Sequence, residues 1–202
     1  MNIIIIILTV LCSYLYGSIP FALVVGKLFY KKDIRTEGSG NLGGTNAGRV
    51  LGSKAGVAVI ILDASKTILS IFLTRFICNQ FNITTDLVYL SALSCIIGHC
   101  YPIFAGFKGG KAVSVAIGYA LTINFWAGIF GLLVFFIVLK LSKYVSLSSI
   151  SGTAAVLFIS PFIGFSTLGI CTNALILALM IYKHRENITR ILNNTERKIT
   201  WM

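Results

Sequence analysis

Long apolar stretches separated by short polar segments dominate the chain. Isoleucine fills positions 3–7, and apolar runs recur as far as residue 183. A helix needs about 20 apolar residues to cross a bilayer, so the pattern predicts an all-α, polytopic bundle of membrane helices. The first span is expected over residues 3–26. It is expected to be retained rather than cleaved, because no basic segment precedes it and no small-residue cleavage site follows it.

Charge is scarce and unbalanced. Charged residues make up 11% of the chain, against about 25% in ordinary soluble domains. This excludes a soluble enzyme, a disordered chain and a disulfide-stapled secreted domain. Lys and Arg number 17 against 6 Asp and Glu, for a net charge of +11. Most of the basic residues gather in four clusters, within residues 27–54, 108–111, 140–143 and 183–198. Because short basic loops stay cytoplasmic, all four clusters are expected on the same side of the membrane.

That shared side requires an even number of crossings between clusters. Residues 55–107, 112–139 and 144–182 are each expected to hold a pair of helices, some short or re-entrant, with outer turns near 79–86, 122–124 and 160–164. Together with the first span, this predicts about seven crossings, with the N-terminus outside and the C-terminus cytoplasmic. Five crossings with re-entrant segments is the alternative. No repeat or linker divides the sequence, so residues 1–202 are expected to form one domain. The five scattered cysteines suit apolar helix positions.

The first basic cluster contains a glycine-rich segment over residues 37–49. Such a backbone can turn tightly and aim its N–H groups at an anion. Ser39 and Thr45 add hydroxyl donors, and Arg49 can grip a phosphate through two hydrogen bonds. The alternative is a flexible loop on the membrane surface.

A second anion cradle is predicted at Lys108-Gly109-Gly110-Lys111, where a helix is expected to begin. The free N–H groups and dipole of a helix N-terminus favour phosphate. The spacing is not that of a nucleotide-binding P-loop. The alternative is a basic stop at the membrane surface.

Two further polar pairs have helical spacing. His184 and Asn187 would share one face of a continuing helix, although a basic tail more often serves as an anchor for anionic lipid. Asp63 and Lys66 lie inside the predicted second span. Ionisable groups at that depth usually pair, so an ion pair facing the bundle interior is expected near the cytoplasmic end.

The motifs that are missing narrow the reaction. The chain has no Gly-x-Ser-x-Gly elbow, no His-x4-Asp acyltransferase motif, no metal-ligand spacing and no dinucleotide fingerprint. Any catalysis must therefore rest on positioning and on cationic stabilisation. A transporter for an organic phosphate is a rival, but its site would lie near the midplane, whereas the glycine-rich segments here are all assigned to one face. A lipid-binding scaffold is a third possibility. Nucleic acid is not expected as a partner, because the basic residues lie in short membrane loops.

Three motifs together closely resemble those of the bacterial acyl-phosphate-dependent glycerol-3-phosphate acyltransferases. The first, Ser-Gly-Asn-x-Gly-x-Thr-Asn-x-x-Arg, runs from Ser39 to Arg49. The second, Gly-His-x-x-Pro-x-Phe-x-x-Phe-Lys-Gly-Gly-Lys, runs from Gly98 to Lys111. The third, His-Arg-x-Asn-Ile-x-Arg, runs from His184 to Arg190 and is followed by Glu196. An Asp-x-x-Lys pair at Asp63 and Lys66 also matches.

The resemblance implies transfer of a fatty acyl group from acyl phosphate to the sn-1 hydroxyl of glycerol 3-phosphate. The products would be lysophosphatidic acid and inorganic phosphate, formed without acyl-CoA, acyl carrier protein, metal or other cofactor. It further implies a monomer in the inner (plasma) membrane, an active site on its cytoplasmic face, and a functional link to an enzyme that forms acyl phosphate. The implied catalytic residues are Ser39, Arg49, His184 and Asn187. The implied substrate-binding residues are Gly40, Asn41, Gly43, Thr45, Asn46, Lys108, Gly109, Gly110 and Lys111. Asp63, Lys66 and Glu196 are expected to be structural.

Four positions depart from the family pattern. Leu42 stands where proline is usual, and Gly44 where alanine is usual. Ala112 replaces a glycine after the second lysine. Asn194 replaces a glycine before the Thr-Glu pair, and asparagine tolerates the left-handed conformation that glycine would supply. None of these changes removes a charged or hydroxyl group.

Overall fold

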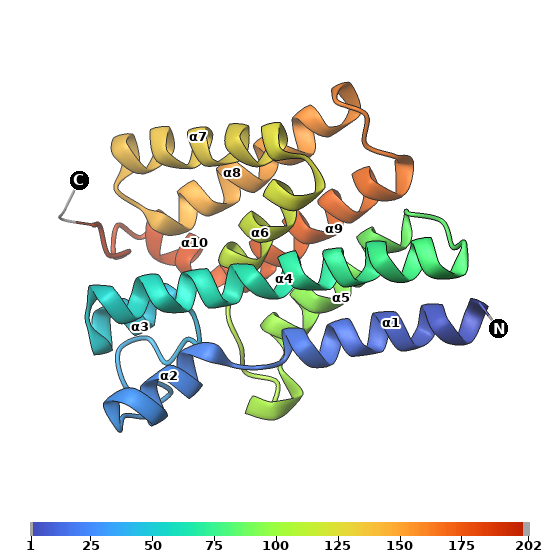
Figure 1. Ribbon diagram of the computed structural model, residues 1–202. Helices are drawn as coiled ribbons and strands as arrows, with labels where there is room; N and C mark the ends of the chain where they lie inside the picture. The colour runs from blue at the N-terminus through green and yellow to red at the C-terminus, as the bar shows by residue number, and fades with distance from the viewer. Residues whose placement is uncertain (1, 200–202) are drawn as a thin grey trace. The chain divides into compact units, whose positions relative to one another are not determined.

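A computed structural model describes residues 2–199, which contain helices joined by short loops and no strand. The chain divides after Tyr119 into two compact units (Figure 1). The expected all-α membrane bundle is confirmed, whereas the single domain over residues 1–202 stays a prediction. The helices are α1 (Asn2–Gly17), α2 (Phe21–Tyr30), α3 (Gly44–Leu51), α4 (Ser53–Phe81), α5 (Leu87–Cys100), the 3-10 helix η1 (Ile103–Ala105), α6 (Val113–Ile123), α7 (Phe125–Ser142), α8 (Val145–Ile159), the 3-10 helix η2 (Ser160–Phe162), α9 (Thr167–Lys183) and α10 (Arg185–Leu192).

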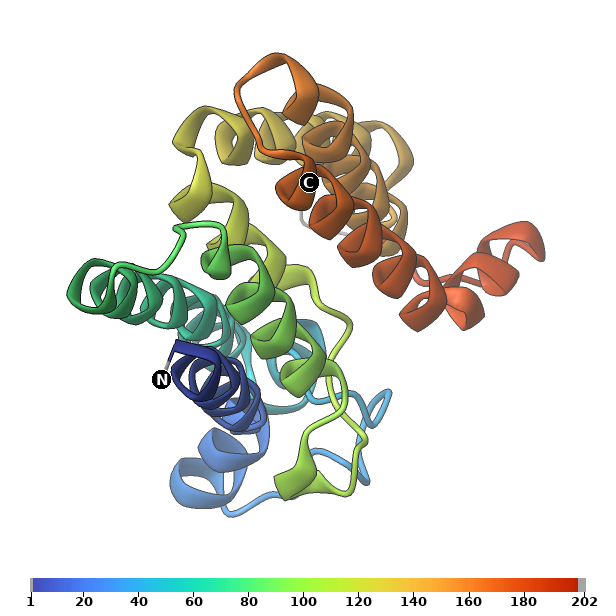
Figure 2. The ribbon, with the colours of Figure 1, turned by 90° about the vertical axis from the view of Figure 1, so that its right-hand side faces the viewer.

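In the first unit, α1, α4 and α5 lie side by side (Figures 1 and 2). The α1 and α5 backbones approach closely, since a Cβ atom added to Gly17 would lie 2.1 Å from the Cys95 carbonyl oxygen. Ser91 joins all three helices, because its hydroxyl lies 2.7 Å from Ser13 Oγ and accepts from Thr74 Oγ1 at 2.7 Å. Small residues and hydroxyl groups thus hold these helices together, as is common between membrane helices.

The first span is not one continuous helix. The expected span over residues 3–26 is interrupted between α1 and α2, and the helical region extends further, to Tyr30. Proline has no N–H to continue the hydrogen-bond ladder, and Pro20 precedes the first residue of α2. The chain therefore changes direction within the segment that the sequence pattern presents as a single apolar run.

Glycines bring α3 against the start of α4. A Cβ at Gly56 would lie 2.7 Å from Gly48 Cα and 3.0 Å from the Gly44 carbonyl oxygen, so backbone would have to move. A Cβ at Gly48 would lie 3.6 Å from its nearest neighbour, which is an ordinary contact. Gly44 itself faces Ile60 closely enough that the alanine usual in the family would collide with it. This contact fixes the end of the first glycine-rich segment against α4.

We expect Gly56→Ala to destabilise the protein by about 1–3 kcal/mol, the usual cost of overpacking. Gly48→Ala is the matched control, because alanine fits there and favours a helix by about 1 kcal/mol over glycine. Thermal unfolding of the two variants in detergent measures the difference. Equal melting temperatures would show that the α3–α4 contact is not tight.

In the second unit, α7 and α8 pack closely through Gly131 and Gly152. A Cβ added to Gly152 would lie 2.7 Å from the Gly131 carbonyl oxygen.

The turns between helices fall where the sequence predicts them. Asn124 caps α7 by accepting a hydrogen bond from the Ala127 N–H at 3.1 Å, and η2 follows α8 at the predicted Ser160–Gly164 break. In the first unit, α4 likewise ends at Phe81 before the predicted 79–86 turn closes.

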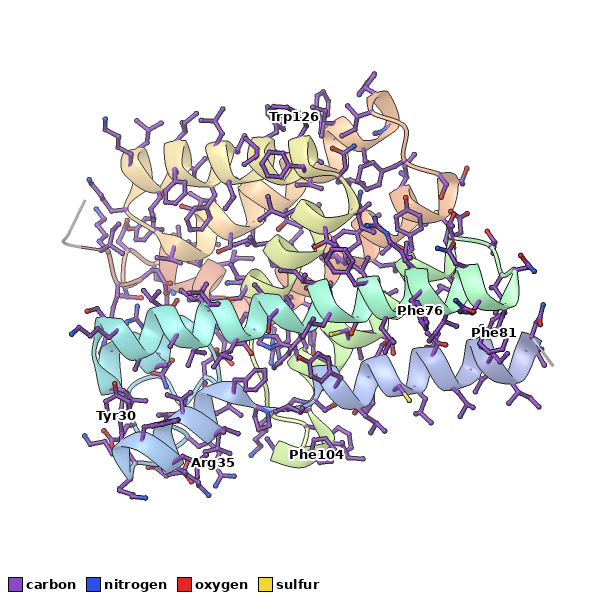
Figure 3. All side chains as sticks on the ribbon, in the orientation of Figure 1. Tyr30, Arg35, Phe76, Phe81, Phe104 and Trp126 are labelled. Atoms are coloured by element: carbon purple, nitrogen blue, oxygen red, sulfur yellow. The ribbon has the colours of Figure 1, made fainter. Side chains whose placement is uncertain are left out.

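Within residues 2–199, five helical segments are long and apolar enough to cross a membrane, with α1 and α2 counted as one. A sixth results if α9 and α10, which are bent by 59°, count as one span, and α6 is a shorter apolar helix. The expected seven crossings and their orientation stay predictions. Large apolar side chains such as Trp126 and Phe76 are exposed at 74% and 60% (Figure 3). Outward apolar side chains suit a lipid environment.

Candidate active site

Asn46 is the centre of the first glycine-rich loop. It is 2% exposed, and its Oδ1 accepts a hydrogen bond from the Ser39 N–H at 2.8 Å. Its Nδ2 donates to the carbonyls of Ile34 at 3.1 Å and Glu37 at 3.3 Å. Gly38 lies directly against the Asn46 side chain with φ of 65°, a conformation that glycine adopts without cost. The Asn46 side chain is thus engaged in shaping the loop.

The loop is also anchored by apolar residues. Ile34 and Leu42 belong to a buried cluster with residues of α2, α3 and α4. Leu42, which stands where the family usually has proline, is 3% exposed. The loop around it is therefore a folded structure, and the alternative of a flexible surface loop is not what the structure shows.

Ser39, Thr45 and Arg49 are exposed on this scaffold. Arg49 lies in the last turn of α3 and, among residues 2–199, makes no hydrogen bond or ion pair. Arg35 behaves differently: its Nη2 lies 2.6 Å from Asp33 Oδ2. The hydrogen bonds from Arg35 hold the pKa of the Asp33 carboxyl below its usual range. The loop thus carries one arginine paired with a carboxylate and one available to an anion.

The Lys108–Lys111 segment of the second motif forms a tight turn, in which Lys111 is half-buried. Phe107 and Ala112 flank the Lys108–Lys111 segment with φ of 59° and 68°, in the left-handed region that costs other residues about 1–2 kcal/mol. Ala112 therefore occupies a conformation that suits the glycine usual at this position. Lys108 is exposed, whereas Gly109 and Gly110 are buried.

The two glycines lie against residues at the end of α5. The Gly110 N–H donates to the His99 carbonyl at 3.0 Å, so it is engaged within the protein rather than turned toward an anion. The first and second motifs meet here, because Asn41 Nδ2 donates to the Gly109 carbonyl at 3.1 Å. Two segments separated by 68 residues thus form one structure.

The predicted ion pair is present in the interior. Lys66 Nζ lies 2.8 Å from Asp63 Oδ1, and both side chains are 1% exposed. Lys66 also donates to the Gly17 carbonyl at 3.3 Å and lies 4.9 Å from the centre of the Phe21 ring. Sequence reasoning missed a third member, His99, whose Nδ1 lies 3.6 Å from Asp63 Oδ1. The position of His99 inside the second motif was the sequence feature that could have indicated a role for it.

His184 lies at a bend rather than within a continuing helix. α9 ends at Lys183 and α10 begins at Arg185, with the axes bent by 59°. The expectation of one helix through His184 and Asn187 is wrong. The reason is local: both the N–H and Nδ1 of His184 contact the Met180 carbonyl, at 3.0 and 2.9 Å, and the residue leaves helical geometry with ψ of 6°.

Glu196 ties the C-terminal tail to the second unit. Its Oε1 accepts from Asn187 Nδ2 at 2.6 Å and from Ser146 Oγ at 3.0 Å, and its Oε2 accepts from Arg190 Nε at 2.8 Å. Partial burial would raise the pKa of Glu196, but these three hydrogen bonds outweigh it and lower the pKa below the usual range. The nearby Asn194 has φ of 56°, as expected for a residue in place of glycine.

We expect the tail to detach at low pH. Because the pKa of Glu196 is lowered in the folded protein, its contribution to stability is present above the unfolded value of 4.5 and is lost as the pH falls through the folded value. The protection of the amide hydrogens of residues 185–199 against deuterium exchange, measured relative to the intrinsic exchange rate at each pH, should therefore fall in acid. Glu196→Gln should show high exchange at neutral pH and little further change on acidification. An unchanged exchange rate in that variant would contradict the role of Glu196.

The sequence-predicted residues thus fall into two groups. The first unit brings together the first two motifs through Asn41 and contains the buried Asp63–Lys66 pair. The second unit brings Asn187 and Glu196 together, with His184 at the adjacent bend.

Comparison with known proteins identifies the family. The model of the family described as glycerol-3-phosphate acyltransferase matches residues 7–194. A glycerol-3-phosphate acyltransferase of Listeria monocytogenes serotype 4a (strain HCC23) is 49% identical over 196 residues, which cover 97% of this chain and 98% of the relative. The chain belongs to the glycerol-3-phosphate acyltransferase family. It is a multi-pass membrane acyltransferase, as the sequence motifs predicted.

Other relatives of this acyltransferase agree. Glycerol-3-phosphate acyltransferase 2 of Bacillus anthracis is 48% identical over 193 residues, covering 96% of this chain and 98% of the relative. The crystal structure of PlsY (YgiH), an integral membrane glycerol 3-phosphate acyltransferase in its glycerol 3-phosphate form, is similar with a TM-score of 0.89 at 36% identity. That match covers 96% of each chain. The lysophosphatidic acid form of PlsY has a TM-score of 0.87 at 35% identity, covering 96% of this chain and 95% of that one.

Proposed function

We propose that this acyltransferase moves a fatty acyl group from acyl phosphate to the sn-1 hydroxyl of glycerol 3-phosphate, in phospholipid biosynthesis. The products are 1-acylglycerol 3-phosphate (lysophosphatidic acid) and inorganic phosphate. The observation that carries the proposal is the hydrogen bond from Asn41 to Gly109, which makes one structure of the two anion-binding motifs. The PlsY crystal structures in the glycerol 3-phosphate and lysophosphatidic acid forms support the acceptor and the product.

The cations of the two motifs bind the phosphate groups. Arg49 and Lys108 are exposed and, within the described residues, have no carboxylate partner that an anion must displace. Ser39 and Thr45 provide hydroxyl donors beside Arg49. Asn41, Asn46 and the glycines of both motifs shape the loops on which these side chains stand.

The transfer needs no covalent enzyme intermediate. The sn-1 oxygen forms a bond to the acyl carbon while the bond from that carbon to the phosphate oxygen breaks. Phosphate leaves with the electron pair of that bond, and one of its oxygens accepts the hydroxyl proton. The cationic loops stabilise the charge that develops on the phosphate and on the acyl oxygen.

His184 as a general base is the competing version. Its Nδ1 lies 2.9 Å from the Met180 carbonyl, which can only accept, so Nδ1 carries the proton and Nε2 is the acceptor in the neutral ring. That tautomer is suited either to receiving a proton or to accepting a hydrogen bond from the substrate hydroxyl.

Replacing His184 separates these roles. We expect His184→Gln to lower kcat by only a few-fold, because the substrate phosphate takes the proton and glutamine still offers a polar atom near the place of Nε2. A general base contributes about 100- to 10,000-fold. A loss in that range, together with loss of the acidic limb of the pH–rate profile, would establish His184 as the base.

The reaction itself is tested with purified protein in detergent. Acyl phosphate and glycerol 3-phosphate should yield lysophosphatidic acid and one equivalent of phosphate, whereas acyl-CoA in place of acyl phosphate should yield little. Product from acyl-CoA alone would overturn the proposed donor. Transport of glycerol 3-phosphate into vesicles without turnover would overturn the proposed function in favour of a carrier.

The proposal extends to the setting of the enzyme. Residues 1–202 act as one domain in the inner (plasma) membrane, as a monomer, with the site on the cytoplasmic face. The placement of the basic clusters supports that orientation. The donor would come from an enzyme that forms acyl phosphate. Accessibility of introduced cysteines in loops 37–49 and 108–111 to a membrane-impermeant thiol reagent tests the cytoplasmic face.

A further inference from the structure

His99 lies between the buried ion pair and the second motif. Its backbone carbonyl accepts the Gly110 N–H at 3.0 Å. Its ring lies directly against Gly110, since a Cβ added to that glycine would lie 2.0 Å from His99 Nε2. A Cβ added to Gly109 would lie 2.1 Å from the His99 carbonyl oxygen. Both glycines are therefore required by their contact with His99, and any larger residue would push the loop away.

The opposite side of the ring is held by α4. His99 Nδ1 lies 3.6 Å from Asp63 Oδ1, which also receives Lys66 Nζ at 2.8 Å. His99 is 5% exposed, and the two partners are 1% exposed. Polar groups at this depth are held in place by their partners, because moving away from them leaves a buried charge unpaired. The ring thus has a fixed position relative to the long helix α4.

The two ring nitrogens face different structures. Nδ1 faces the Asp63 carboxylate, and Nε2 faces the backbone of Gly110. From there the connection continues to the first motif, because the Gly109 carbonyl accepts the Asn41 side chain. A planar ring with polar atoms on two edges suits this place, and an aliphatic side chain of similar volume would fill the space without placing a nitrogen near the Asp63 carboxylate.

We propose that His99 is a positioning residue, which transmits the fixed position of the Asp63–Lys66 pair to the Gly109–Gly110 backbone and so sets where Lys108 and Lys111 stand. It acts through the loop and touches neither substrate. The inference rests on the proposed function, in which the Lys108–Lys111 segment holds the phosphate of glycerol 3-phosphate. It assigns to the buried ion pair a role in substrate affinity in addition to stability.

The test compares two replacements of His99. His99→Asn keeps a polar amide facing the Asp63 carboxylate, whereas His99→Leu keeps the volume and removes the polar group. We expect His99→Leu to raise the KM for glycerol 3-phosphate about tenfold or more, since small misplacements of binding groups cost up to about 100-fold. His99→Asn should raise it less. The KM for acyl phosphate should change by less than threefold in both, a bound that follows if the loop holds only the acceptor.

Ser91→Ala is the matched control, because Ser91 is buried in the same helix and hydrogen-bonded to α1 and α4 but lies away from the loop. It should lower the melting temperature and leave the KM for glycerol 3-phosphate unchanged. If His99→Leu does the same, His99 is only part of the core and the proposal fails. The proposal also fails if the KM for glycerol 3-phosphate of His99→Leu is equal to or lower than that of His99→Asn.

A binding measurement separates this inference from the proposed reaction. Calorimetric titration of the wild-type protein with glycerol 3-phosphate should give binding that is weakened in His99→Leu, with or without turnover. If the wild type binds glycerol 3-phosphate but does not use acyl phosphate, the donor is wrong and the role of His99 still stands. Equal binding by wild type and His99→Leu would overturn the role of His99 alone.

Discussion

Arg49→Ala should lower kcat/KM by about 100- to 1000-fold, the loss seen when a group that stabilises developing charge is removed. Arg49 is exposed at the end of α3, and no carboxylate among the described residues neutralises it. Its guanidinium can therefore engage a phosphate fully and through two hydrogen bonds. Initial rates with acyl phosphate and glycerol 3-phosphate as varied substrates measure the effect. The overall fold should be unaffected, because the side chain is exposed and makes no hydrogen bond or ion pair among the described residues.

Arg35→Ala is the matched control in the same loop. Arg35 is also exposed (Figure 3), but its Nη2 is paired with Asp33 Oδ2 at 2.6 Å. An exposed ion pair of this kind contributes little to stability, so its loss should change kcat/KM by less than a few-fold. Equal losses in the two variants would mean that the reaction depends on the net charge of the loop and not on the position of Arg49.

Lys66→Met should destabilise the protein by about 3–5 kcal/mol, because it leaves the buried Asp63 carboxylate without its cation. The double variant Asp63→Asn/Lys66→Met should recover most of that loss, since no buried charge then remains unpaired. Lys54→Met is the control: Lys54 is exposed at the start of the same helix. A thiol-reactive dye can follow unfolding, because Cys78, Cys95 and Cys100 are buried in the folded protein.

The double variant separates the role of the ion pair in stability from its role in positioning the Lys108–Lys111 loop. If it folds with near-normal stability but has a raised KM for glycerol 3-phosphate, the pair serves the loop through His99. If Lys66→Met itself melts like the wild type, the pair contributes little to stability and the assignment of these two residues as structural is wrong.

The sequence predicted features that depend on local pattern. The helical bundle, with its turns at Asn124 and Ser160–Gly164, was predicted from the apolar runs, the turn residues and the basic clusters. The ion pair was predicted from the helical spacing of Asp63 and Lys66. The three sequence motifs predicted the family. The left-handed conformation of Asn194 was also foreseeable, because it follows from the backbone preference of one residue.

Contacts between distant segments could not be predicted in this way. Gly110 looked like a donor to phosphate, yet its N–H is engaged by the His99 carbonyl. The bend at His184 arises from a hydrogen bond between its own ring and the Met180 carbonyl, which competes with the regular helix. Neither partner is marked by composition or period, since backbone carbonyls have no signature in a sequence.

The lysine of the buried pair also completes the end of α1. A helix leaves its last carbonyls without partners, and the Gly17 carbonyl receives Lys66 Nζ at 3.3 Å, from a residue 49 positions away. A cation at this place stands in for a missing backbone amide and complements the negative end of the helix dipole. The bend of the first span is thus encoded twice, by Pro20 locally and by Lys66 from another helix. Replacing Pro20 alone would leave Lys66 in place, and its hydrogen bond to the Gly17 carbonyl would still stabilise the end of α1 at that residue.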